Sequence, residues 1–184
     1  PKMKKAELRE GIAWEAGQHI PYSIEDVNLD FQILREAGPG EQEMDVLLVA
    51  VKKDTLNAYL AVISAAGLSA AVVDVDAFAI ENAFTMSKKV QPGEVMALVN
   101  IGAAVTNINI LHGEISDFTR DSPLGGNRHT ESLQKSLGLS FEQAEVLKRG
   151  EPVEGHSVAD AMPVVEMANS ELAGEIRRSF DFYY

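Results

Sequence analysis

The chain has 184 residues, and 46% of them are hydrophobic, which is enough for a packed core and argues against disorder. Its formal net charge of -12 at pH 7 argues against nucleic acid or an anionic membrane as a general partner, because both require basic patches. The absence of cysteine excludes a disulfide framework and a thiolate zinc site. No segment approaches the ~20 apolar residues of a membrane-spanning helix, and the N-terminus lacks the apolar centre of a secretory signal, so we expect a soluble cytoplasmic protein.

The first elements predicted are a helix and a strand. Residues 2–20 place apolar side chains four positions apart, from Leu8 to Ile20, which is the spacing of a helix with one apolar face. Pro21 is expected to end this helix, because proline cannot donate the next backbone hydrogen bond. Residues 27–34 alternate apolar and polar side chains and therefore predict a half-buried strand.

A second strand and a second helix follow a glycine-containing turn. Residues 44–52 form an almost continuous apolar run, which predicts a more deeply buried strand. Asp54 is expected to cap the next helix and Gly67 to end it. The apolar face of that helix consists of Leu56, Tyr59, Leu60 and Ile63. With a further strand predicted at residues 69–78, the order helix–strand–strand–helix–strand is that of a ferredoxin-like unit without its first strand. The chain is therefore expected to begin inside a fold.

A second domain is expected from residue 93, after a connecting helix at residues 79–89 and a turn. The elements expected there are strands at 95–100, 106–111 and 114–120, and helices within 122–138, 139–150 and 158–184. Ser140 and Gln143 predict a capping box at the start of the second of these helices. Pro163 is expected to start or kink the last one.

The junction of the first two strands in this domain has two interpretations. Residues 99–111 combine Gly102 with short side chains and with asparagine at alternate positions. A tight β-hairpin would explain this, because glycine and asparagine tolerate positive φ. A loop whose backbone amides bind phosphate would explain it too. Taken alone the segment favours the hairpin, because phosphate-binding loops are far rarer.

Two later features change this comparison. Gly125 and Gly126 form a loop that enters a helix, and Glu145 and Lys148 lie three residues apart on one helical face. A solvated surface ion pair would explain the second feature by itself. Taken in this order, however, the glycine-containing hairpin, the Gly-Gly loop and the Glu-x-x-Lys helix resemble the nucleotide side of the actin-like ATPases.

Within that superfamily the chain resembles the PilM family of type IV pilus assembly proteins, which are relatives of the division protein FtsA. The resemblance lies in residues 13–34, 74–84, 99–111, 124–133, 140–150 and 175–184. It implies an incomplete actin-like (ribonuclease H-like) α/β fold, with a ferredoxin-like subdomain called 1C and a connecting helix in residues 1–92 and most of the second lobe in residues 93–184. An N-terminal subdomain with a first phosphate loop would precede Pro1, and a last adenosine loop would follow Tyr184.

The resemblance also implies a nucleotide site for ATP and Mg²⁺. The residues it assigns to that site are Asn100, Gly102, Thr106, Asn107, Gly125, Gly126, Glu145 and Lys148. The hairpin would be the second phosphate loop, the Gly-Gly loop would line the nucleotide cleft, and Glu145 and Lys148 would hold the adenosine.

The phosphate loop departs from the superfamily pattern Asp-x-Gly-Gly-Gly-Thr-x-Asp. Asn100 and Asn107 stand at the two acidic positions, while alanines replace two glycines and Val105 replaces the threonine. Asparagine cannot supply the negative charge that helps to hold Mg²⁺, so metal binding is expected to be weak or absent. Whether ATP is hydrolysed stays open, since phosphoryl transfer depends on metal and charge placement.

No other catalytic or metal-binding set is predicted. The four histidines are scattered and show no metal-ligand spacing. Asp74 and Asp76 are interpreted as solvated charges at a strand end or as a contact at the hinge between the lobes, and Asp117, Arg120 and Asp121 as polar charge beside a loop.

Three functional hypotheses follow. In the first, which the resemblance favours, the chain belongs to a cytoplasmic adaptor that binds the N-terminal tail of the inner-membrane protein PilN and is held at that membrane through it. Other pilus assembly proteins would be further partners, and self-association is left open. In the second, it is a working actin-like ATPase or an FtsA-like division protein. The third, a ligand-sensing ferredoxin-like module, is disfavoured by the motif order in the second half.

Overall fold

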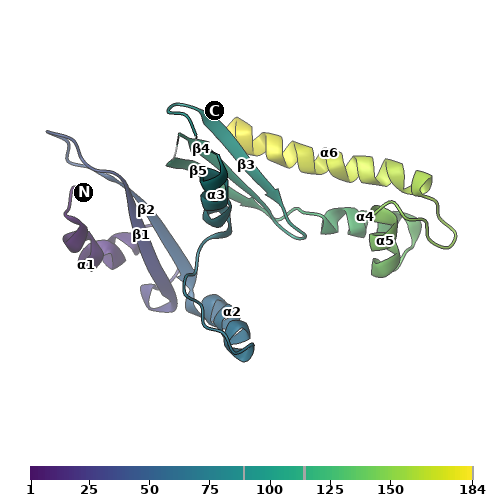
Figure 1. The fold of residues 1–184 in the computed structure, drawn as a ribbon, viewed down its shortest axis with the longest axis horizontal. Helices are drawn as coiled ribbons and strands as arrows, with labels where there is room; N and C mark the ends of the chain where they lie inside the picture. Colours follow the sequence, from purple (N-terminus) through teal and green to yellow (C-terminus); the bar gives the residue numbers. More distant parts are fainter. Residues whose placement is uncertain (89, 114, 184) are drawn as a thin grey trace. The chain divides into compact units, whose positions relative to one another are not determined.

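The computed structural model describes residues 1–88, 90–113 and 115–183. It contains two compact units, Pro1–Val73 and Asp74–Tyr184, which are described separately (Figure 1). The helix expected to connect the two halves belongs to the second unit. The boundary between the compact units therefore lies between Val73 and Asp74, before the predicted domain boundary between residues 92 and 93. The assignment of residues 1–92 and 93–184 to family subdomains stays a prediction.

The first unit is built from two helices, a short 3₁₀ turn and a two-stranded sheet. Its elements are α1 (Lys5–Ala16), the 3₁₀ turn Ile24–Asp26, β1 (Val27–Arg35), β2 (Asp45–Lys52) and α2 (Lys53–Ala65). The strands pair antiparallel, with Val27 opposite Lys52. Leu8 and Ala16 of α1 are buried together with Val27. The first helix and both strands were correctly predicted, because their apolar periodicity is regular. The expectation that Pro21 ends the helix was wrong, since α1 ends at Ala16 with Gly17 as its C-cap.

Three further predictions for this unit were wrong. The strand β2 has no buried residue, because β1 is the one strand that pairs with it in the part of the chain that the structure describes. Asp54 does not cap α2: the strand runs straight into the helix, so Lys52 is the N-cap and Asp54 lies in the first turn. Residues 69–75 form no strand, and the side chains of Val72 and Val73 are exposed. Gly67 does follow the end of α2, with a φ of 76°.

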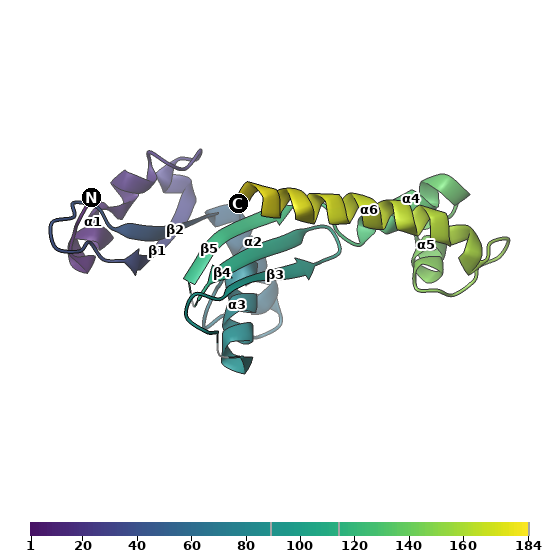
Figure 2. The ribbon, with the colours of Figure 1, turned by 90° about the horizontal axis from the view of Figure 1, so that it is seen from above.

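The second unit contains a three-stranded antiparallel sheet between two helices. Its strands are β3 (Val95–Ile101), β4 (Thr106–His112) and β5 (Ile115–Ser122), in the order β3-β4-β5. The helices α3 (Asp76–Ser87) and α6 (Val158–Tyr183) lie on opposite faces of this sheet (Figure 2). The central strand β4 is buried on both faces, which fixes the position of the hairpin at its start.

Each face of the sheet is joined to its helix by polar contacts. On the α3 face, the Asn109 amide donates to Glu81 at 2.9 Å, and its oxygen accepts from Ser116 and Thr119. On the α6 face, Arg120 of β5 forms a 2.9 Å ion pair with Glu175. These contacts hold the sheet against both helices and so support the turn between β3 and β4.

Two shorter helices pack against α6. They are α4 (Asn127–Leu137) and α5 (Phe141–Lys148), and their shared core contains Leu133, Leu139, Ala144, Leu147 and Ala161. The capping box of Ser140 and Gln143 is present as predicted, because both reciprocal hydrogen bonds form. Pro163 lies inside α6 and does not start it.

Glu175 makes the stability of this unit dependent on pH. Its side chain is 12% exposed between Arg120 and Arg178, and its pKa lies below the ordinary 4.5, chiefly because of the hydrogen bond from Arg178. A lowered folded-state pKa stabilises the fold above the unfolded value and loses that contribution as the pH falls through the folded value.

We therefore expect Glu175→Gln to lower the free energy of unfolding at pH 7 by about 1–3 kcal/mol, the range for hydrogen bonds to charged groups. The difference from the wild-type chain should shrink as the pH falls from 4.5 through the lower pKa of the folded state, because Glu175 is then protonated first in the unfolded chain and afterwards in the folded one. Urea denaturation at a series of pH values measures this. The control is Glu171→Gln, whose exposed ion pair with Arg128 is screened by solvent, so its loss should lower stability much less than the loss of the Glu175 charge. Equal losses in both variants would contradict the role given to Glu175.

Candidate functional site: a hairpin turn against a helix start

The turn between β3 and β4 is attached to the start of α4. Gly102 donates its amide to the Val105 carbonyl at 2.9 Å, which closes the turn. The carbonyl oxygens of Gly102 and Ala103 accept from the amides of Gly126 and Asn127 at 2.9 and 2.7 Å. Two amides at the helix start, which have no partner within a helix, are satisfied in this way. The carbonyls of the turn are therefore directed at α4.

The amides of the same turn have a different environment. Those of Ala103, Ala104 and Val105 donate no hydrogen bond to any acceptor within residues 1–88, 90–113 and 115–183. All three residues are exposed. Consecutive backbone amides in a turn form a concave site for anions, with partial positive charge and no side chain required. The turn therefore has the donor chemistry that a phosphate group needs.

The Gly-Gly loop is shaped by this contact. A Cβ atom on Gly125 would lie 2.7 Å from the Ala103 carbonyl oxygen and closer still to that of Gly102. Gly126 has more room, since its nearest atom would be 3.8 Å away, and its φ of -57° suits any residue. Gly125 is thus required for the close approach of the two backbones, and Gly126 is not.

Thr106 anchors the loop that precedes α4. Its side chain is fully buried, and its hydroxyl donates to the Leu124 carbonyl at 2.6 Å. Thr106 was expected at the nucleotide site. Its hydroxyl is already engaged with residue 124, so its role in this structure is to support the Gly-Gly loop.

Asn100 and Asn107 belong to a row of side chains that crosses all three strands. The Asn100 amide donates to the Asn107 oxygen at 2.9 Å, and the Asn107 amide donates to Asp121 at 2.8 Å. Mg²⁺ prefers carboxylate or water oxygens. In this row the Asn107 oxygen and one Asp121 oxygen are already engaged as acceptors. Within the described residues no group of three or more His, Cys, Asp or Glu side chains is placed to hold a metal. The donor set does not fit a directly coordinated Mg²⁺.

Glu145 and Lys148 pair with each other and contact the first residues of α4. Lys148 forms an ion pair with Glu145, donates to Thr130 at 2.9 Å, and approaches the Gly126 carbonyl at 3.5 Å. Both side chains are roughly three-quarters buried, with 23% and 27% exposed for Lys148 and Glu145. The hydrogen bonds from Lys148 and then Thr130 lower the pKa of Glu145, so its carboxylate is charged at neutral pH. This pair is not a solvated surface pair.

The eight residues predicted from the sequence fall into one connected region. Gly102 is bonded to Gly126, which Lys148 approaches, and Asn100 and Asn107 lie on the two strands that enter the turn. Two further residues, Asp121 and Thr130, were not predicted. The strand register opposite Asn107 would have indicated Asp121, which was interpreted as loop charge. Thr130 is four residues after Gly126 in the helix, and its role depends on how α5 packs against α4.

The fold is that of an actin-like protein. The structure is similar to that of MreB5 of Spiroplasma citri bound to AMPPNP, with a TM-score of 0.51 and 16% identity over 71% of this chain and 48% of that one. It is also similar to MreB5 of the same organism bound to ADP, with a TM-score of 0.52 and 14% identity over the same shares. At these identities the likeness is one of fold, and it confirms the predicted actin-like α/β architecture, with this chain covering about half of each matched chain.

The family is more specific. A family model described as type IV pilus assembly protein PilM matches residues 1–184. A solved structure described as the PilM-PilN type IV pilus biogenesis complex matches all of this chain, with a TM-score of 0.81 and 30% identity. The chain belongs to the PilM family, as its resemblance predicted, and it spans 53% of the matched chain in that complex. None of the helices in the described ranges is both long and apolar enough to cross a membrane.

Proposed function

We propose that this chain is the PilN-binding and nucleotide-binding part of a cytoplasmic actin-like adaptor in type IV pilus assembly. The observation that carries the nucleotide part is the turn at residues 102–105, where two carbonyls are bonded to the start of α4 and three backbone amides have no acceptor among the residues that the structure describes. The PilN part is supported by the family match and by the matched PilM-PilN complex.

In this proposal the exposed amides of Ala103, Ala104 and Val105 bind phosphate oxygens of ATP. Backbone amides suit this role because they cannot move away or change their charge. Glu145 and Lys148 hold the adenosine, and their contacts with Thr130 and Gly126 fix them relative to the turn. The similar fold of MreB5, whose solved structures carry AMPPNP and ADP, is consistent with a nucleotide here.

The proposal assigns this site to binding rather than to turnover. Phosphoryl transfer needs charge placed at the transferring group, and that charge usually comes from carboxylate-bound Mg²⁺. Asn100 and Asn107 carry no charge, and the row that they form with Asp121 leaves one carboxylate near the turn. ATP would therefore stabilise the contact between the hairpin turn and the start of α4 without being consumed rapidly.

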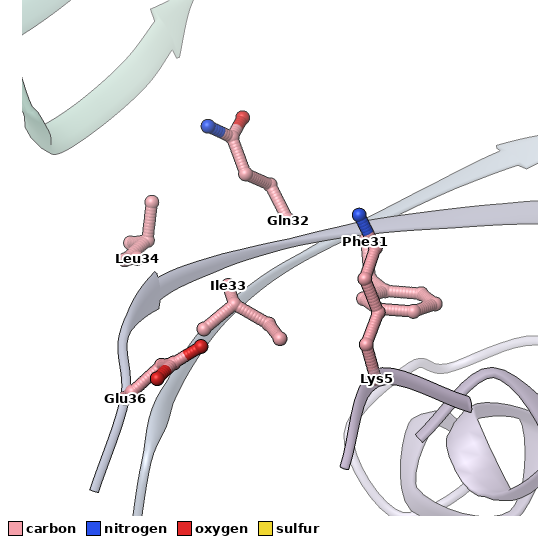
Figure 3. Close-up of a pocket in the computed structure, with 6 residues that line it drawn as sticks. All are labelled: Lys5, Phe31, Gln32, Ile33, Leu34 and Glu36. Carbon is pink, nitrogen blue, oxygen red and sulfur yellow. The ribbon is translucent and has the colours of Figure 1, made fainter. Parts of the chain in front are cut away.

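The first unit offers a site for the PilN tail. A cavity of about 410 Å³ is lined by Lys5, Phe31, Gln32, Ile33, Leu34 and Glu36. Figure 3 shows Phe31 of β1 directed toward Lys5 at the start of α1. Among the described strands, β1 pairs with β2 alone, so its other edge has unpaired backbone groups. An extended peptide commonly adds to such an edge while its side chains enter neighbouring pockets.

We expect Phe31→Ala to weaken binding of a PilN tail peptide about tenfold in the full-length protein, which corresponds to ~1.4 kcal/mol. Isothermal calorimetry measures this. Tyr59→Ala is the matched control, because Tyr59 is an aromatic residue of the same unit that is 73% exposed on α2 and does not line the cavity. A loss in the Tyr59 variant with none in the Phe31 variant would place the peptide elsewhere.

A further inference from the structure

We propose that Thr130 is a positioning residue of the nucleotide site, which sets the geometry of Glu145 and Lys148; this inference rests on the nucleotide binding proposed above. Thr130 lies in the second turn of α4 and is fully buried. Its hydroxyl is the point at which α4 meets the charged pair of α5.

The hydrogen bonds around this hydroxyl have one consistent arrangement. Lys148 can only donate, so the Thr130 oxygen accepts from its ammonium group at 2.9 Å. The single hydroxyl proton is then shared between two acceptors, the Glu145 carboxylate and the Gly126 carbonyl at 3.4 Å. The carboxylate is charged and nearer, so the hydroxyl donates its hydrogen bond to the carboxylate. Thr130 therefore holds both members of the pair at the same time.

This arrangement leaves part of Glu145 available. The bonds from Thr130 and Lys148 both end on Glu145 Oε1. Within the described ranges Oε2 has no hydrogen-bond partner, and the side chain is 27% exposed. An acceptor oxygen held in a fixed direction suits the hydroxyl or amino groups of a nucleoside. Without Thr130, the carboxylate would be free to rotate and Lys148 would lose one of its fixed contacts.

The test compares two matched pairs in the full-length protein. Thr130→Val removes the hydroxyl and keeps the side-chain shape, while Thr130→Ser and Thr130→Ala both lose the methyl group and differ in the hydroxyl alone. We expect ATP affinity, measured by calorimetry, to fall five- to tenfold in the Val variant relative to wild type and in the Ala variant relative to Ser. The Ala–Ser comparison serves if the Val variant does not fold.

A double variant separates positioning from a merely structural role. Because Thr130 acts through Glu145 as well as Lys148, Thr130→Val should cause a smaller fold-loss of ATP affinity when Lys148→Ala is already present than it causes alone. Independent, multiplicative losses would overturn the inference, as would unchanged affinity in the hydroxyl-free variants while the wild-type protein binds ATP. Failure of the wild-type protein to bind ATP would instead overturn the proposed nucleotide function, and the role of Thr130 with it.

Discussion

Gly125→Ala is expected to lower the free energy of unfolding of the second unit by about 3 kcal/mol, from an overpacked contact and lost hydrogen bonds. The added Cβ would lie 2.7 Å from the Ala103 carbonyl oxygen, closer than real Cβ atoms approach. Because both contacting groups are backbone, the hairpin would have to move away from α4. That movement breaks the bonds from Gly126 and Asn127 to the turn.

Urea denaturation of the full-length protein checks this expectation. The matched control is Gly126→Ala at the adjacent position, where the nearest atom would be 3.8 Å away and the backbone is helical. That variant should change stability by less than about 1 kcal/mol. Equal destabilisation by the two substitutions would show that the close contact between hairpin and helix is not what the second unit depends on.

Lys148→Ala is expected to lower ATP affinity about tenfold, because a charge-assisted hydrogen bond contributes roughly 1.5–3 kcal/mol. The alternative role for this lysine is to offset the negative end of the α5 dipole, an effect of about 0.3–1 kcal/mol on stability alone. Its contacts with Thr130 and the Gly126 carbonyl favour the first role, because they direct the ammonium group at the start of α4.

Calorimetric titration with ATP distinguishes these roles when Arg149→Ala is measured beside it. Arg149 is the next residue, carries the same charge at the same helix end, and is exposed. Its loss should leave ATP affinity unchanged and reduce stability slightly. An unchanged ATP affinity in the Lys148 variant would contradict the nucleotide role and favour the interpretation of the turn between β3 and β4 as an ordinary hairpin.

Local sequence patterns predicted most of the elements correctly. The alternation in β1, the capping box at Ser140 and the glycine after α2 each act within a few residues, so they do not depend on the rest of the fold. The strand predicted at residues 69–78 does not form, although its apolar and β-branched side chains are typical of strands. A strand also needs a neighbour with which to exchange hydrogen bonds, and none of the strands in the described ranges pairs with those residues.

The residues of the candidate site were selected from the order of three motifs along the chain. The contacts between those residues could not be predicted in this way. Asp121 reaches Asn107 because of the pairing register of β4 and β5, and that register includes a bulge near Leu111. Thr130 meets Lys148 because α5 packs beside α4 over the core around Leu133. Both contacts depend on how elements pack in three dimensions, which periodicity along one element does not contain.

The central claim is that this site retains ATP without consuming it rapidly. The direct measurement is to incubate the full-length protein with ATP and Mg²⁺, desalt it rapidly, and quantify bound ATP, bound ADP and released phosphate over time. The account predicts that intact ATP stays bound and that phosphate is released much more slowly than ~1 per second, the low end of ordinary enzyme rates. Turnover at that rate or faster, or the absence of bound nucleotide, would contradict it.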